Sequence, residues 1–183
     1  MAAQSTILLF IKNTERKSNF MIDAYRGFFA ASAGASAAFI GLLFVAISFI
    51  DGEKTNQKDA AWRQIVANSS FTQLINVFFV SLAGLLPSPY AVALTGCIMA
   101  VIGLIVSISL LSPTMDSDRT GRTTPTVLGI AAFGVYALEL ITAFGLLHNP
   151  NSQTLLDFFI LSILLLYAGG LARAWGITGI KNH

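Results

Sequence analysis

Five long blocks of apolar residues, separated by short polar stretches, dominate the chain. Spanning a bilayer takes about 20 mainly apolar residues, because its hydrocarbon core is about 30 Å thick and a helix rises about 1.5 Å per residue. Backbone groups in that core find no water, and continuous apolar runs do not alternate as barrel strands do, so each block is predicted to be a helix. The predicted spans are 28–50, 69–86, 90–111, 125–147 and 154–175.

The predicted fold class is therefore all-α, a polytopic transmembrane helical bundle, with residues 1–183 forming a single transmembrane domain. Gln73 and Asn76 interrupt the second span, and a re-entrant or four-span arrangement follows if this segment does not cross the bilayer. Residues 58–68 are expected either to lie on the membrane interface or to extend the second helix outward. Residues 1–27 are predicted to form a partly helical lead-in.

The composition supports a membrane protein. Apolar residues make up 55% of the chain and charged residues 11%, whereas a soluble domain carries about 25% charged residues. The mean hydropathy is +0.71. The net charge is only +2, so we expect the lipid bilayer, and not nucleic acid, as the partner. The basic residues do not fix the orientation, and the expected location is the plasma membrane or a bacterial inner membrane.

Glu139 is the main candidate for chemistry, because it lies near the middle of the fourth predicted span. It is about nine residues from His148, which places it about 13 Å deep at 1.5 Å per residue. An ionisable group at that depth is costly, and proton relay or ion coordination is its usual role. The alternative is a structural glutamate whose hydrogen bonds hold helices together. Both interpretations remain open.

Other polar residues are expected at the level of Glu139. Depth counting places residues of the first, second and fifth spans at a similar or slightly greater depth: Ser36, Asn76, Ser162, Gln73 and Tyr167. Unsatisfied polar groups in hydrocarbon are costly, so we expect these side chains to converge in one polar layer. Such a layer either hydrogen-bonds the helices to each other or lines a hydrated path.

The first predicted span is poor in bulky side chains. Small residues recur along it at spacings of four, three and four: Ala30, Gly34, Ala37 and Gly41. This small-residue stripe favours close packing of helices, within one protomer or between protomers. The same lack of bulk would let the helix lie at the axis of an oligomer and line a pore with Ser32 and Ser36.

The remaining candidates are weaker. Asp157 lies in the first turn of the fifth span, where a carboxylate suits the helix dipole. Arg173 lies near its end, where it is expected to reach the interface. His148 has no histidine or cysteine at ligand spacing, so no metal and no other cofactor is expected. Without a second deep acid or a nucleophile motif, the chain is not expected to be an enzyme.

Two classes of function follow from these observations. In the first, a homo-oligomer forms a channel or pore for ions or protons, and Glu139 and the polar layer control passage. In the second, the chain is a non-transporting structural or accessory subunit, which packs on itself or in a larger membrane complex.

Overall fold

The computed structural model describes residues 25–48, 57–111 and 123–178, and the helical lead-in expected before residue 25 lies outside this part of the chain. The described residues form five helices and no strand. These helices are Tyr25–Ser48 (hereafter the first helix), α2 (Gln57–Gly84), α3 (Pro89–Leu111), α4 (Thr123–His148) and α5 (Gln153–Thr178). The prediction of an all-α bundle is confirmed.

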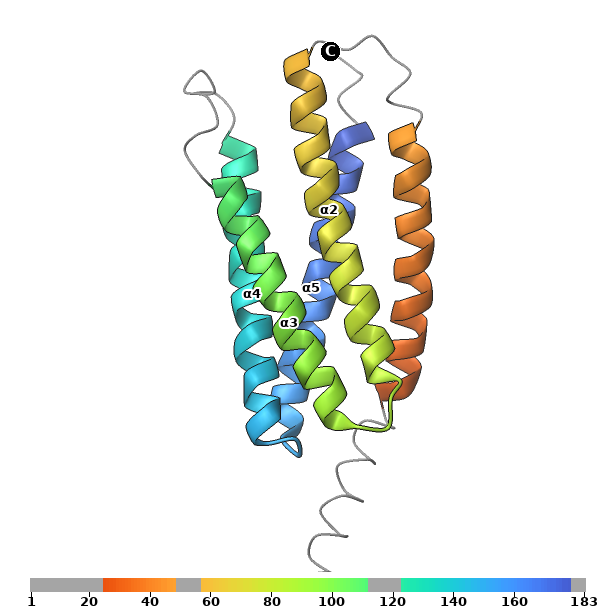
Figure 1. Ribbon diagram of the computed structural model, residues 1–183, viewed down its shortest axis with the longest axis vertical. Helices are drawn as coiled ribbons and strands as arrows, with labels where there is room; N and C mark the ends of the chain where they lie inside the picture. Colours follow the sequence, from red (N-terminus) through yellow and green to blue (C-terminus); the bar gives the residue numbers. More distant parts are fainter. Residues whose placement is uncertain (1–24, 49–56, 112–122, 179–183) are drawn as a thin grey trace, which may run out of the picture.

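The helices run side by side along the long axis of the molecule (Figure 1). α2 and α5 pack against each other, and α3 and α4 form a closely packed pair that contacts them on one side. The first helix, in red and orange in Figure 1, lies on the other side. It contacts α2 through the rings of Phe44 and Phe71, 5.2 Å apart, and α5 through those of Phe39 and Tyr167, 5.9 Å apart.

Four of the helices have the length and composition of membrane spans. Within the described part of the chain, these spans cover Tyr25–Ser48, Pro89–Ile108, Gly129–His148 and Gln153–Ala174. Large apolar side chains cover their outer surfaces, with Leu94 55%, Ile105 60% and Ile141 68% exposed. A water-soluble protein rarely exposes contiguous apolar surface on this scale. The chain is therefore a membrane protein whose apolar outer surface faces lipid.

α2 is the longest helix, with 28 residues, but it is not apolar enough to be counted among these four spans. Its polar side chains face inward: Ser69, Gln73, Asn76 and Ser81 are all buried, while Phe79 is 48% exposed. The helix runs alongside its neighbours through the bundle (Figure 1), unlike a re-entrant segment. Residues 58–68 belong to α2, so they extend the second helix and do not form a separate one.

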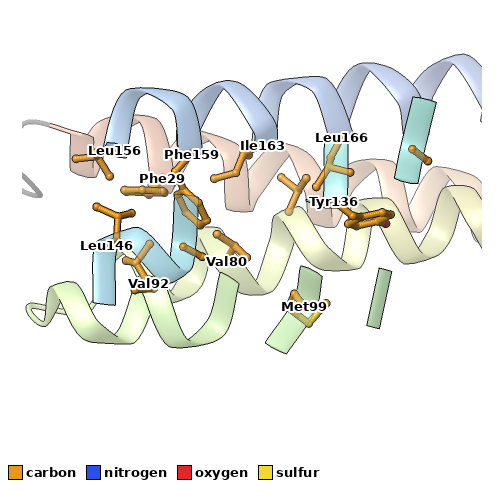
Figure 2. Packing of buried hydrophobic residues seen from close by; sticks show 14 residues of the cluster. Phe29, Val80, Val92, Met99, Tyr136, Leu146, Leu156, Phe159, Ile163 and Leu166 are labelled. Atoms are coloured by element: carbon orange, nitrogen blue, oxygen red, sulfur yellow. The ribbon is translucent and has the colours of Figure 1, made fainter. Parts of the chain in front are cut away.

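The interior of the bundle is packed with apolar side chains, drawn in Figure 2. Three buried aromatic rings each lie against a glycine of another helix: Phe29 against Gly84, Phe159 against Gly96 and Tyr136 against Gly103. A Cβ atom at Gly96, for example, would lie 2.7 Å from two carbon atoms of the Phe159 ring. Because glycine has no side chain, each ring can lie directly against the backbone of the neighbouring helix.

Candidate functional site

Glu139 lies in the interior of the bundle, where its side chain has 0% exposure. It projects from α4 toward α2, where Asn76 is also fully buried. The Nδ2 atom of Asn76 donates a hydrogen bond of 2.8 Å to Oε2 of Glu139. The sequence placed these two residues at a similar depth, and the structure brings them into direct contact.

The acid–amide pair, Glu139 and Asn76, and Gln73 each carry an acceptor that lacks a donor. In the described part of the chain, five buried side-chain oxygens have no hydrogen-bond partner, and three of them are Oε1 of Glu139, Oδ1 of Asn76 and Oε1 of Gln73. Gln73 lies one turn before Asn76 on α2, on the same side of the helix. Its amide lies against α5, where a Cβ atom at Gly169 would be 3.3 Å from Oε1. Three neighbouring acceptors in this part of the interior therefore lack a donor.

Tyr136 extends the site along α4. It lies one turn before Glu139, is 2% exposed, and its hydroxyl has no partner among the described residues. Its phenol lies within electrostatic range of Glu139 and of Arg173 on α5. Sequence reasoning did not single out Tyr136, although its spacing of three residues from a buried acid puts both side chains on one helix face.

A second polar group lies between the first helix, α2 and α5. The Ser36 hydroxyl donates to the Ser32 carbonyl oxygen at 2.7 Å and lies 3.1 Å from the Tyr167 hydroxyl. The Tyr167 hydroxyl lies 3.1 Å from the same carbonyl oxygen, and the Ser81 hydroxyl donates to the Ser32 hydroxyl at 2.9 Å. Ser36 and Tyr167 are thus placed with Ser32 and Ser81, and their described hydrogen bonds do not reach Glu139.

Ser162 is buried in α5, but its hydroxyl donates to the carbonyl oxygen of Phe159 on the same helix at 2.6 Å. Ser32 and Ser36 also point into the bundle and contact helices of their own chain. If another protomer packed against the outer side of the first helix, these two serines would face away from it. They would therefore not line a pore at that interface.

The small-residue stripe of the first helix lies on the outer surface. Its four members, Ala30, Gly34, Ala37 and Gly41, are all exposed. A Cβ atom added at Gly34 or at Gly41 would have nothing within 4 Å. The two glycines of the stripe therefore make no close helix contact with the described part of their own chain.

The two charged residues of α5 differ from expectation. α5 begins at Gln153 and has no acidic residue in its first turn, so Asp157 lies just beyond the turn in which it was expected. Arg173 is 5% exposed and donates a hydrogen bond to the hydroxyl of Ser69 on α2, so its side chain points into the bundle and not outward as the sequence had suggested. α5 continues to Thr178, which leaves Arg173 inside the helix. Asp157 is exposed and accepts a 2.6 Å hydrogen bond from the hydroxyl of Tyr25, which joins the first helix to α5.

Sequence reasoning missed Ser69, Ser81 and Arg173 as members of the buried polar groups. The signal was present in α2, where polar residues at 69, 73 and 76 recur with the helical period. Residues three or four apart share one face of a helix, so this face was a candidate for the interior.

These features define a class, a polytopic α-helical membrane protein with a buried acid–amide pair in its interior. No protein-family model, curated protein or solved structure matches the chain. Its function must therefore be inferred from the site itself.

Proposed function

We propose that this protein is a channel or pore of the cell membrane that passes protons or small cations, and that Glu139 is the group that binds them. The path runs through the interior of each protomer, along the side of α4 that carries Glu139 and Tyr136. The proposed activity is to bind the ion and let it pass, with no substrate converted, and the functional unit is a homo-oligomer.

The observation that carries this proposal is the excess of buried acceptors around Glu139. Each unsatisfied buried acceptor costs about 1–3 kcal/mol, and three of them lie on Gln73, Asn76 and Glu139. If these residues served only to hold the helices together, apolar side chains of similar size would do so without this cost. Acceptors without donors suit a positively charged species, because a proton or a cation supplies what they lack.

One further residue, Tyr136, supports a path with more than one binding group. The Tyr136 hydroxyl has no described partner and can both donate and accept a hydrogen bond. Because it lies one turn from Glu139 on the same face of α4, we count it as a second group along the proposed path. Ionisable groups within membrane spans commonly form proton relays of this kind.

The test is a flux assay on the purified full-length protein in lipid vesicles. A potassium gradient with valinomycin sets the membrane potential, and dyes inside the vesicles report protons and sodium separately. Wild type is expected to pass one of these ions, and Glu139→Gln is expected to lower the flux to that of empty vesicles. Asp157→Asn is the matched control, because it makes the same change from carboxylate to amide at an exposed position, and it should retain wild-type flux.

A non-transporting packing role is the second candidate, and the exposed small-residue stripe favours it. A helix face on which Gly34 and Gly41 meet nothing within 4 Å can approach another helix closely. Wild-type vesicles without flux of either ion, together with self-association that Gly34→Leu abolishes, would favour this role over transport.

A further inference from the structure

The hydrogen bond between Asn76 and Glu139 leaves one oxygen of each residue without a partner. Nδ2 of Asn76 donates to Oε2 of Glu139 at 2.8 Å. Oδ1 of Asn76 and Oε1 of Glu139 then remain, and neither has a hydrogen-bond partner among the described residues. An ionised carboxylate and an amide oxygen both only accept hydrogen bonds, so these two atoms cannot satisfy each other.

A single proton on the carboxyl group would give both unpartnered oxygens a hydrogen bond. A carboxyl that carries a proton on Oε1 becomes a donor at that atom and keeps Oε2 as an acceptor. An acid and a primary amide are complementary in this form, because each then has one donor and one acceptor. Oε1 can donate to Oδ1 of Asn76 while Nδ2 continues to donate to Oε2.

The groups that face Glu139 from the neighbouring helices do not supply a compensating charge. Its one described side-chain hydrogen bond is with the neutral Asn76 of α2. The Cys97 thiol of α3 and the Tyr136 phenol of α4 lie within electrostatic range of it. On α5, the guanidinium of Arg173 donates to Ser69 and interacts with Tyr136. A buried carboxylate without a paired cation is strongly disfavoured against its neutral form.

We propose that Glu139 holds a proton on Oε1 and shares it with Oδ1 of Asn76, so that the species bound by this site is the proton and not a metal cation. Uptake forms an O–H bond at Oε1 with a proton taken from water at one membrane face. Release breaks that bond and returns the proton to water at the other face, so the protein is unchanged after each passage. This inference rests on the proposed function, because the proton occupies the carboxyl proposed to carry the ion.

A bound metal cation is the competing explanation, since Gln73, Asn76 and Glu139 offer oxygens of the kind that hard cations prefer. The two explanations differ in what they require of Glu139. A cation needs the ionised carboxylate as its charged ligand, whereas the acid–amide pair needs the neutral form.

The direct test is infrared spectroscopy of the full-length protein in lipid nanodiscs at neutral pH. We expect a carboxylic-acid C=O stretching band that is lost in Glu139→Gln and retained in Asp157→Asn. Asn76→Leu should shift this band toward that of an acid without a hydrogen-bond partner. If Glu139→Gln removes only carboxylate bands, the proposal is overturned.

Thermal stability provides a second measurement that does not depend on transport. In Glu139→Gln the new amide nitrogen can donate where the carboxyl proton did, so this variant should melt at the wild-type temperature. Asn76→Leu removes the partner and should lower the melting temperature. A wild-type melting temperature that rises in sodium chloride relative to choline chloride, with no such rise in Glu139→Gln, would instead identify a metal cation as the ligand.

The flux assay separates failure of this inference from failure of the proposed function. If the acid band is present but no ion flux is measured, the bound proton on Glu139 is supported and the proposed transport is refuted. If sodium flux is measured and Glu139 gives only carboxylate bands, the proposed transport is supported and the proton is refuted as the bound species. Proton flux together with the acid band supports both.

Discussion

Replacing Gly96 by alanine is expected to destabilise the bundle, because the new methyl group would meet a ring that cannot move aside. The added Cβ would lie 2.7 Å from two ring carbons of Phe159 and 3.2 Å from the Cβ of Ala143. Carbon atoms in good contact are about 3.5–4.0 Å apart, so the overlap with the ring is about 1 Å. Phe159 is 0% exposed, and Ile163 and Leu166 of the same helix are equally buried; Figure 2 shows all three in the packed interior.

The expected magnitude follows from two opposing effects. Overpacking a tightly filled interior costs about 1–3 kcal/mol. Glycine to alanine in a helix stabilises by about 1 kcal/mol. A matched control separates the two, because Gly134→Ala on α4 makes the same change where nothing lies within 4 Å of the new atom. The free energy of unfolding of Gly96→Ala should therefore fall about 1–3 kcal/mol below that of Gly134→Ala.

The assay is reversible unfolding by sodium dodecyl sulfate in mixed micelles, followed by circular dichroism. The overlap should disappear when the ring is removed, so Gly96→Ala should cost less in a Phe159→Ala background than in wild type. Contacting residues usually show such non-additivity, by about 0.5–3 kcal/mol. Equal stability of Gly96→Ala and Gly134→Ala would refute the close contact between α3 and α5 at this position.

Three further substitutions test other contacts. Tyr167→Phe keeps the ring contact with Phe39 but removes the hydroxyl that lies 3.1 Å from both the Ser36 hydroxyl and the Ser32 carbonyl oxygen. At about 0.5–1.5 kcal/mol per hydrogen bond, the free energy of unfolding should fall by about 1–2 kcal/mol. Tyr25→Phe removes an exposed bond instead and should cost less; the reverse order in the same unfolding assay would contradict the buried network. Gly34→Leu should not lower stability, because nothing lies within 4 Å of the added Cβ, while analytical ultracentrifugation in detergent should show weaker self-association. A loss of stability in Gly34→Leu would mean that this face packs within the protomer.

The sequence by itself determined the class and the number of helices in the described part of the chain. The thickness of the bilayer fixes the length of a span, so runs of about 20 apolar residues are visible without a structure. The predicted ends lie close to those of α3, α4 and α5. α2 begins at Gln57, before the span predicted from residue 69, which agrees with one of the two alternatives for residues 58–68, an outward extension of the second helix. Hydropathy alone did not decide between them, because it reports the part of a helix that suits lipid and not where the helix begins.

Only the tertiary structure decided which side chains meet. Counting residues gives the depth of a side chain along the membrane normal, and this was enough to place Asn76 near Glu139. It does not give the rotation of a helix about its own axis, so it could not separate Ser36, which contacts Tyr167, from the acid at the same depth. For the same reason, the sequence alone did not show whether the small-residue stripe faces inward or outward. Packing of the first helix against α2 and α5 turns its serines inward and leaves Gly34 and Gly41 on the outside.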